Sequence, residues 1–374
     1  MAGDILDDVK AVCSTDIEDL LRFAVERGAS DLHITVPYPP SLRINGVITP
    51  IADMPSVAPD DAARIFDSIT SEAQRQTFQE QLELDFLYQI PDVARFRVNA
   101  CLQQNSLSIS FRAIPFRVPT IDELGLPEVC KTLAMKHHGL VLVTGPTGVG
   151  KTTTMACMVN YINQHTARKI VTIEDPVEYA YSRGKAMIIQ RDLGNDTRSF
   201  YEALKHALRQ DPNVILVGEM RDLETMAAAV SAAETGHLVI STLHTIGAAA
   251  TIERIIDAFP PHQQPQIRLQ LSLVLEGVLS QLLLPRANGS GRVAAFEVML
   301  GTFAIRNLIR EAKIHQVHTV MELSSGEGMR TLAQDVRRLE REGCITIDRG
   351  LVQMYGLPTE LIGSEAGPQS VSYL

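Results

Sequence analysis

The chain has 374 residues, which is enough for two or three domains of about 100–200 residues each. Its net charge of −10 and pI near 5.5 disfavour a protein that coats nucleic acid, and no apolar run reaches the roughly 18 residues of a membrane span. The Asp-rich start is not a secretory signal, and the five cysteines are scattered without a C-x-x-C pair. We therefore expect a cytoplasmic protein without a structural zinc site or a disulfide framework.

Residues 1–113 predict a small α+β domain with an antiparallel sheet. Thr15 and Glu18 have the spacing of a capping box, and the apolar positions that follow keep helical intervals as far as Gly28. Asn45-Gly46 predicts the turn of a hairpin over 41–51. The other elements expected here are a helix over 59–79 and strands at 31–35, 84–88, 94–102 and 106–113.

The segment 114–127 carries three prolines and predicts a linker across which two domains change their relative orientation. From residue 128 apolar strands alternate with helices, which is typical of a mostly parallel sheet and predicts an α/β domain over 128–300. The expected strands are 140–144, 169–173, 187–190, 214–217 and 238–242, and the expected helices are 197–209, 223–234, 248–258 and 265–284. Residues 301–374 predict a helical region that ends in a loose tail.

A phosphate-binding loop lies in 140–154, where an apolar strand runs into a glycine-rich turn and then a helix. The fixed positions of G-x-x-x-x-G-K-[ST] are filled, and they bring a mobile lysine charge for the β and γ phosphates of ATP and a hydroxyl ligand for Mg²⁺. The alternative, a glycine-rich turn that only closes a βα unit, fits this context poorly. The predicted nucleotide-binding residues are Gly145, Pro146, Thr147, Gly148, Val149, Gly150, Lys151, Thr152 and Thr153, with Thr152 as the metal ligand.

Acidic residues follow two later strands, at the sheet edge where α/β proteins bind ligands. Glu174 and Asp175 follow the strand at 169–173, with Glu178 close behind, and Glu219 follows the strand at 214–217. Such carboxylates hold Mg²⁺ or orient an attacking water, although each alone is equally compatible with a helix cap or a surface ion pair. Two carboxylate sites beside a P-loop favour the functional interpretation.

His237 and His244 bracket the strand at 238–242. A separation of seven residues places the two histidines at opposite ends of the strand and on opposite faces of the sheet, which disfavours a shared metal site. For each, one interpretation is a hydrogen-bonded histidine that ties a strand end to a loop. For His244, at the carboxyl end, the other is a sensor of the γ-phosphate.

Four segments in order resemble the Walker A, aspartate, Walker B and histidine boxes of secretion and type IV pilus ATPases: GPTGVGKTTT, VTIEDPVEY, LRQDPNVILVGEMRDLET and GHLVISTLHT. The resemblance extends to SDLHIT, RFRVNA and FRAIP near the N-terminus. AIRNLIRE at 304–311 resembles the signature of pilus retraction ATPases, although its periodicity alone indicates only an amphipathic helix. The chain departs from the family at Val149 and Thr152, where serine is common, and it has no four-cysteine zinc-binding insertion.

The resemblance implies a RecA-like P-loop NTPase core with a smaller N-terminal PAS-like α+β domain and a C-terminal helical region. It also implies a homohexameric motor for pilus retraction and twitching motility, with each nucleotide between the two domains of one subunit and completed by a neighbour. Glu174 would polarise the attacking water, Glu219 would orient the metal shell, and His244 belongs to the histidine box. Arg97 and Arg112 in the first place, and Arg95 after them, would act as fingers from the N-terminal domain. Alternatively these arginines face solvent from an alternating strand.

The implied partners are a platform protein of the inner membrane and an accessory retraction ATPase, with neither nucleic acid nor zinc, and the implied location is the inner face of the cytoplasmic membrane. Three other functions stay open. They are an accessory retraction ATPase or related secretion ATPase, a non-hydrolysing nucleotide-gated assembly factor, and a P-loop nucleic-acid motor, which the acidic composition disfavours.

Overall fold

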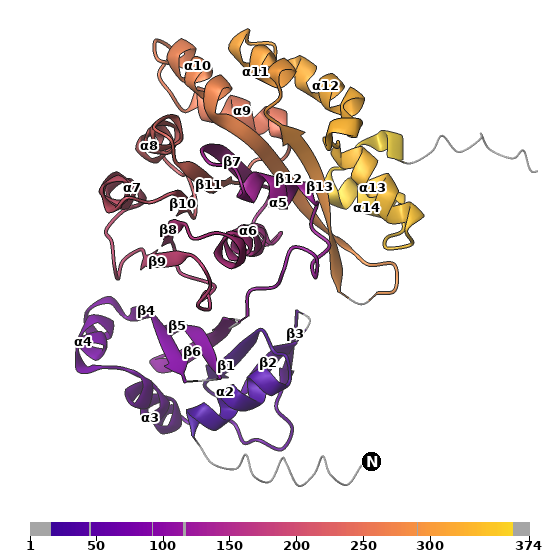
Figure 1. Ribbon diagram of the computed structural model, residues 1–374. Coiled ribbons are helices and arrows are strands. Elements are labelled where there is room, and N and C mark those ends of the chain that lie inside the picture. Colours follow the sequence, from indigo (N-terminus) through magenta and orange to yellow (C-terminus); the bar gives the residue numbers. More distant parts are fainter. Residues whose placement is uncertain (1–15, 45, 92, 115–116, 290, 362–374) are drawn as a thin grey trace, which may run out of the picture. The chain divides into compact units, whose positions relative to one another are not determined.

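The computed structural model describes residues 16–44, 46–91, 93–114, 117–289 and 291–361, and it divides between Arg117 and Val118 into two compact units (Figure 1). This division falls within the predicted linker. Three sequence-based features lie outside the described residues: Thr15, Asn45 and the tail at 362–374. Within the described part of the chain, every helix is too short or too polar to cross a bilayer.

The N-terminal unit is built on a six-stranded antiparallel sheet in the order β3-β2-β1-β6-β5-β4. Its strands confirm the predicted ones: β1 (Asp31–Thr35), β2 (Ser41–Ile44), β3 (Val47–Pro50), β4 (Glu83–Ile90), β5 (Ala94–Gln103) and β6 (Ser106–Ile114). Helix α2 (Ile17–Glu26) confirms the first predicted helix, and Asp16 caps it by accepting from the Glu18 backbone N–H at 3.0 Å. Alternate residues of the sheet, such as Ile34, Phe96 and Phe111, form the core.

The single helix predicted over 59–79 is wrong. The structure has α3 (Pro59–Ile69) and α4 (Glu72–Gln81), because Thr70 adopts an extended backbone and its hydroxyl donates to the Phe66 carbonyl at 2.6 Å. Ser71 then starts α4 with a capping box to Gln74. These local side-chain to backbone hydrogen bonds therefore end one helix and start another, although the helical spacing of apolar residues continues through the sequence.

The C-terminal unit is built on a seven-stranded sheet in the order β13-β12-β7-β11-β10-β8-β9. Every neighbouring pair is parallel except β12 and β13, so the predicted mostly parallel sheet is confirmed. The strands are β7 (Gly139–Thr144), β8 (Lys169–Glu174), β9 (Met187–Asp192), β10 (Val214–Val217), β11 (Leu238–Leu243), β12 (Leu275–Pro285) and β13 (Arg292–Leu300). The helices along it are α5 (Val129–Ala134), α6 (Lys151–His165), α7 (Phe200–Ala207), α8 (Leu223–Glu234), α9 (Ala248–Asp257) and α10 (Gln264–Val274).

Two predictions for this unit need correction. The helix predicted over 265–284 ends at Val274, and the rest is the interior strand β12, which is buried between β7 and β13. β13 was not predicted. The helix predicted over 197–209 begins only at Phe200, where Ser199 caps it, and ends as a 3₁₀ turn, η1 (Leu208–Gln210).

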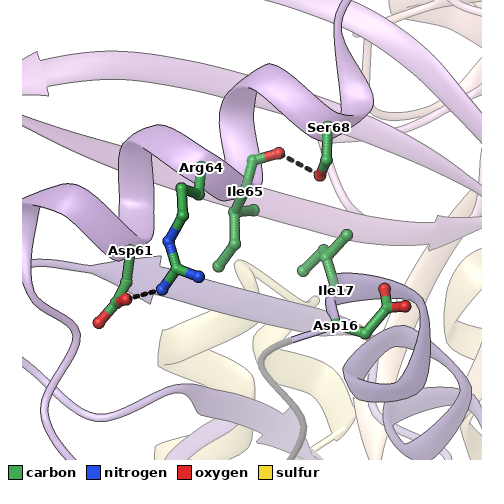
Figure 2. A pocket seen from close by; sticks show the side chains of 6 residues that line it. All are labelled: Asp16, Ile17, Asp61, Arg64, Ile65 and Ser68. Carbon is green, nitrogen blue, oxygen red and sulfur yellow. Dashed lines mark hydrogen bonds and ion pairs between the residues drawn. The ribbon is translucent and has the colours of Figure 1, made fainter.

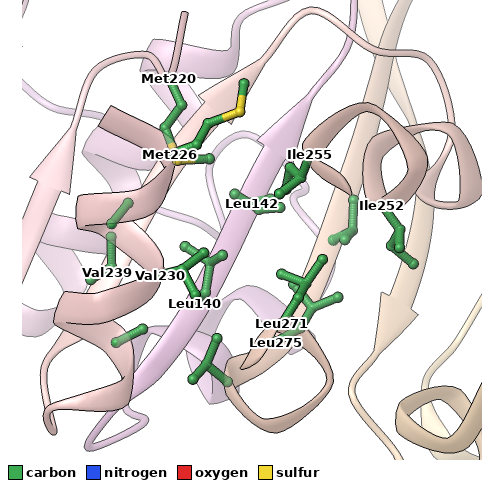
Figure 3. Packing of buried hydrophobic residues seen from close by; sticks show 14 of the residues in the cluster. Leu140, Leu142, Met220, Met226, Val230, Val239, Ile252, Ile255, Leu271 and Leu275 are labelled. Carbon is green, nitrogen blue, oxygen red and sulfur yellow. The ribbon is translucent and has the colours of Figure 1, made fainter. Parts of the chain in front are cut away.

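Strand β7 passes through the middle of this core, and its side chains alternate between two apolar layers. Leu140 and Leu142 face α8, α9 and α10 (Figure 3), where they pack in one cluster with residues such as Val230. Val141 and Val143 belong to the cluster that contains residues of α5 and α6. Packing on both faces fixes the end of β7, from which the P-loop starts.

The helices after β13 form the C-terminal part of this unit. They are α11 (Phe303–Arg310), α12 (Val317–Leu323), α13 (Leu332–Arg341) and α14 (Arg349–Tyr355), with 3₁₀ turns η2 (Ile314–Gln316), η3 (Ser325–Glu327) and η4 (Thr359–Leu361). Val149 of the P-loop is buried in one apolar cluster with Leu282 of β12 and Leu339 of α13. That packing gives a physical reason for an apolar residue where serine is common.

Candidate functional site

The P-loop connects β7 to α6 and requires glycine at particular positions. Gly145, Gly148 and Gly150 have φ angles of +135°, +80° and +88°, where L side chains are disfavoured. A Cβ on Gly145 would also lie 2.3 Å from the backbone oxygen of Gln281 in β12. The loop is therefore pressed against the central sheet while its backbone N–H groups stay available for a phosphate.

Lys151 is buried at the start of α6 and reaches back over the loop. Its Nζ donates to the carbonyl oxygens of Gly145 at 2.7 Å and Pro146 at 2.9 Å. Burial lowers the pKa of this amine, and the charge of Glu219 acts in the opposite direction. A buried cation held mainly by carbonyls favours an anionic ligand, because a phosphate would compensate its lost hydration.

The ends of β7, β11 and β10 bring three predicted site residues into one hydrogen-bonded run. His244 Nδ1 lies 3.2 Å from Lys151 Nζ, and His244 Nε2 lies 2.9 Å from Glu219 Oε1. On the far side, Arg221 Nε donates to Glu219 Oε2 at 2.9 Å. His244 thus connects the P-loop lysine to the carboxylate that follows β10, and these contacts are compatible with both interpretations of His244, as a histidine that ties a strand end to a loop and as a γ-phosphate sensor.

Glu174 ends β8, the next strand of the sheet, and is only 5% exposed. Its Oε1 accepts from the Thr172 hydroxyl at 2.6 Å and from Gln190 Nε2 at 3.3 Å. Burial raises the pKa of this carboxyl, and the two hydrogen bonds only partly oppose it. A buried carboxylate with a raised pKa is suited to accept a proton from water.

The residues at this edge fit a magnesium ion. The Thr152 hydroxyl and the Glu219 carboxylate are hard oxygen donors, and Mg²⁺ usually takes one or two protein oxygens together with water and substrate phosphates. Glu219 is held in place by His244 and Arg221, so its carboxylate is oriented before any ligand arrives.

His237 lies at the other end of β11 from His244. Its Nδ1 is 3.0 Å from the Ala232 carbonyl and 3.3 Å from the Thr235 hydroxyl. These contacts agree with a histidine that ties the strand to the end of α8.

Arg97 and Arg112 belong to the N-terminal unit, where they lie opposite each other on β5 and β6. Arg112 Nε is 2.9 Å from Asp31, and Arg97 Nε is 3.9 Å from Asp85. Arg95, two residues along the same strand, donates to Gln89 at 3.0 Å. Both predicted fingers keep a large exposed fraction, 45% for Arg97 and 68% for Arg112, so they are accessible within their own unit.

Gln281 is a site residue that sequence reasoning missed. It is 3% exposed in β12, where its Oε1 accepts from Thr154 Oγ1 at 2.8 Å and its Nε2 donates to the Val149 carbonyl. This one side chain therefore holds the end of the loop and the first turn of α6. The available signal was a glutamine among the mostly apolar residues 277–284, but these were predicted to be part of a helix.

The N-terminal unit contains a cavity of about 300 Å³ that is separate from the P-loop residues (Figure 2). It is lined by α2 and α3, including an ion pair between Asp61 and Arg64, and the Ser68 hydroxyl donates to the Ile65 carbonyl at 2.7 Å. None of the predicted site residues lines it, so we place the candidate site at the P-loop.

Comparison with known proteins gives consistent relatives. The family described as "Type II/IV secretion system protein" matches residues 7–350. The type IV pilus retraction ATPase PilT of Pseudomonas aeruginosa is 47% identical over 331 residues, covering 88% of this chain and 96% of that protein. The type IV pilus ATPase PilU of the same organism is 41% identical over 336 residues, covering 90% and 88%. A crystal structure described as the pilus retraction motor PilT with bound ADP is 46% identical with a TM-score of 0.83, covering 89% of this chain and 95% of that one.

Proposed function

Because this chain belongs to the type II/IV secretion system protein family, we propose that it is an ATP-hydrolysing motor that powers the retraction of type IV pili and hence twitching motility. The observation that carries this proposal is the hydrogen-bonded run from Lys151 through His244 to Glu219, at adjacent strand ends of a RecA-like core. A P-loop alone would fit many nucleotide-binding proteins, whereas this run in a chain 47% identical to a retraction ATPase supports the motor specifically.

Each predicted site residue has a role in this proposal. The loop 145–150 and Lys151 hold the phosphates of ATP, with Thr153 next to them at the start of α6. Glu174 accepts a proton from the attacking water, and its burial supports that role. His244 contacts the γ-phosphate side of the site and keeps Glu219 oriented. Thr152 and Glu219 hold Mg²⁺, which supplies positive charge to the phosphate oxygens when it is bound.

The N-terminal unit contributes the arginines. Arg97 and Arg112 stabilise negative charge on the phosphoryl group of a neighbouring subunit in a homohexameric ring, a role worth about 10³-fold or more in rate in other phosphoryl-transfer systems. Their exposure and their shared position on one sheet face support this role. Hydrolysis then changes the angle between the two units across the 114–127 segment, and the ring passes this change on as displacement.

The partners follow from the same proposal. The ring acts at the cytoplasmic face of the inner membrane on the platform protein of the pilus, so that pilin subunits leave the filament base. An accessory retraction ATPase cooperates with it. Neither nucleic acid nor zinc has a part in this cycle.

One nearer alternative has some support. The chain is 41% identical to the pilus ATPase PilU, which makes an accessory retraction ATPase the second candidate. The higher identity to PilT over a similar share of the chain favours the principal motor.

Deletion of the gene followed by microscopy tests the function. We expect hyperpiliated cells whose pili cannot pull, and we expect the intact gene, but not a Lys151→Ala version, to restore retraction. Normal retraction in the deletion strain would overturn the proposal. Full rescue by Lys151→Ala would show that ATP hydrolysis by this chain is not the source of the force.

A further inference from the structure

A second concave site lies in the C-terminal helices, outside the nucleotide site. It is a cavity of about 270 Å³ between η3, the loop that follows it and α13. Three arginines line it, Arg330, Arg338 and Arg341, together with the polar side chains of Ser325 and Gln334. No acidic residue is among the side chains that line it within the described part of the chain.

The charge balance of this cavity is positive. Asp335 is fully buried behind it, and its Oδ1 pairs with Arg330 and, at 2.8 Å, with Arg338. Asp335 thus pairs with two of the three guanidinium groups that line the cavity, and that of Arg341 is not one of them. Glu342 pairs with Arg338 at 2.7 Å, and Arg341 contacts only the Arg337 carbonyl, at 3.3 Å, among the described residues. Positive charge in excess of its counterions, gathered in a concavity, favours an anion from solution.

The hydrogen-bonding capacity points the same way. A guanidinium has five N–H donors, and contacts within the described residues engage at most two on any of the three arginines. The acceptor nearest to them, Asp335, is already committed, since its Oδ2 accepts from the Phe296 backbone N–H at 2.8 Å. The cavity is therefore rich in donors and poor in acceptors. Three forks match the several oxygens of a phosphate better than the two oxygens of a carboxylate.

The cavity is also held rigidly. Asp335 ties α13 to β13 through Phe296, and Phe296 lies opposite Gln281 in the pairing of β12 with β13. The arginines are thus mounted on the strand pair that supports the P-loop, and a preformed site binds without a large ordering cost.

From this geometry we propose that the cavity lined by Arg330, Arg338 and Arg341 binds a phosphate-bearing anion, as a site separate from the P-loop. The phosphate comes either from a soluble phosphorylated compound or from the headgroup of an anionic phospholipid.

The test uses the full chain with Lys151→Ala, so that the P-loop is weakened, and titrates inorganic pyrophosphate by calorimetry without nucleotide. We expect binding that becomes at least about tenfold weaker when Arg341→Gln is added, a loss of about 1.4 kcal/mol. Arg341 is chosen because its removal leaves the pairs of Asp335 intact. The matched control is Arg337→Gln on the same helix, whose guanidinium donates to the Glu360 carbonyl and does not line the cavity.

A second arm measures flotation with vesicles of phosphatidylglycerol in phosphatidylcholine, using the same variants. A loss with Arg341→Gln in the pyrophosphate arm assigns a soluble ligand, and a loss only with vesicles assigns a lipid headgroup. Absence of binding in both arms would overturn the proposal. So would equal losses with Arg337→Gln and Arg341→Gln, because a general effect of net charge would then explain the binding.

Discussion

Among single residues, Glu174 has the environment that hydrolysis most needs. It is buried at a strand end and keeps two hydrogen bonds to its Oε1, so its position does not depend on contact with the P-loop. We predict that Glu174→Gln binds nucleotide normally and loses at least about 10²-fold in turnover, since the amide cannot accept the proton. Binding of a fluorescent ADP analogue and phosphate release measure the two effects separately.

The control for this variant is Glu202→Gln, which changes an exposed glutamate of α7 and should leave turnover unaffected. Substantial residual hydrolysis in Glu174→Gln would instead assign the base to Glu219 or Glu178.

The raised pKa of Glu174 predicts a pH dependence. Glu174 must be ionised to act as the proposed general base, so turnover should fall as the pH decreases through a pKa that burial has moved above the usual 4.5. Nucleotide binding should persist over the same range, because acid keeps Lys151 protonated even though burial lowers its pKa. Measurements of kcat and of nucleotide affinity across this pH range test the prediction. An acid limb within the ordinary glutamate range, or a parallel loss of affinity, would contradict it.

Gln281 acts on the same site through the P-loop. Gln281→Met keeps the volume but leaves Thr154 and the Val149 carbonyl without their buried partner, each at a cost of about 1–3 kcal/mol. We predict a loss of stability in urea together with nucleotide affinity reduced about tenfold. Thr154→Val and the double variant complete a cycle in which the two losses should not add. Reduced stability with unchanged nucleotide affinity would make Gln281 an ordinary core residue.

Two glycines of the P-loop, Gly145 and Gly148, differ in why glycine is needed there. Gly148 has φ of +80° and open space around its Cβ position, so Gly148→Ala should cost only the left-handed backbone, about 1–2 kcal/mol. Gly145→Ala adds a Cβ 2.3 Å from the backbone of β12, which is hydrogen-bonded to a strand on each side and cannot move aside. We predict a clearly larger loss for Gly145→Ala in unfolding measurements made without nucleotide. Similar losses for the two variants would mean that the loop is not pressed against β12.

The limits of sequence reasoning also appear at the scale of elements. Short strands bounded by glycine, proline or charged residues were predicted closely, as β1, β10 and β11 illustrate. The end of the helix predicted over 265–284 was not, since residues 275–284 are mostly apolar and buried on both faces, and such a segment has no period that separates helix from strand. Its pairing with β7 and β13 decided the outcome, and β7 lies far away along the chain.

The candidate site divides in the same way. The placement of the P-loop, Glu174, Glu219 and His244 at one edge of the sheet could be predicted because each lies at the end of a recognisable strand, and parallel strands end at one edge. Gln281 could not be predicted, because its role exists only once β12 lies beside the loop. The cavity lined by Arg330, Arg338 and Arg341 could not be predicted either, because it depends on the buried Asp335. From the sequence alone, an aspartate at that place in an amphipathic helix would be expected to face solvent.

At the scale of the whole molecule, the N-terminal sheet presents a row of charged residues from four adjacent strands. Arg43, Asp31, Arg112 and Arg97 occupy successive positions across β2, β1, β6 and β5. Asp31 pairs with Arg43 and Arg112, and it is nearly buried between them. Like charges directly opposite each other destabilise a sheet, so the placement of Arg97 beside Arg112 costs stability that a function would explain.

Arg112→Ala tests that function in the assembled protein. Asp31 keeps Arg43 at 3.6 Å as a partner, so the N-terminal unit should fold and the proposed ring should persist in size-exclusion chromatography with light scattering. We predict that turnover falls at least about tenfold while nucleotide affinity changes little, because a finger acts on charge that develops during the reaction. Arg22→Ala on α2, an exposed arginine paired within its own helix, serves as the control and should hydrolyse ATP normally. Unchanged hydrolysis in Arg112→Ala, with the ring intact, would remove Arg112 from the catalytic groups and leave Arg97 to be tested in the same way.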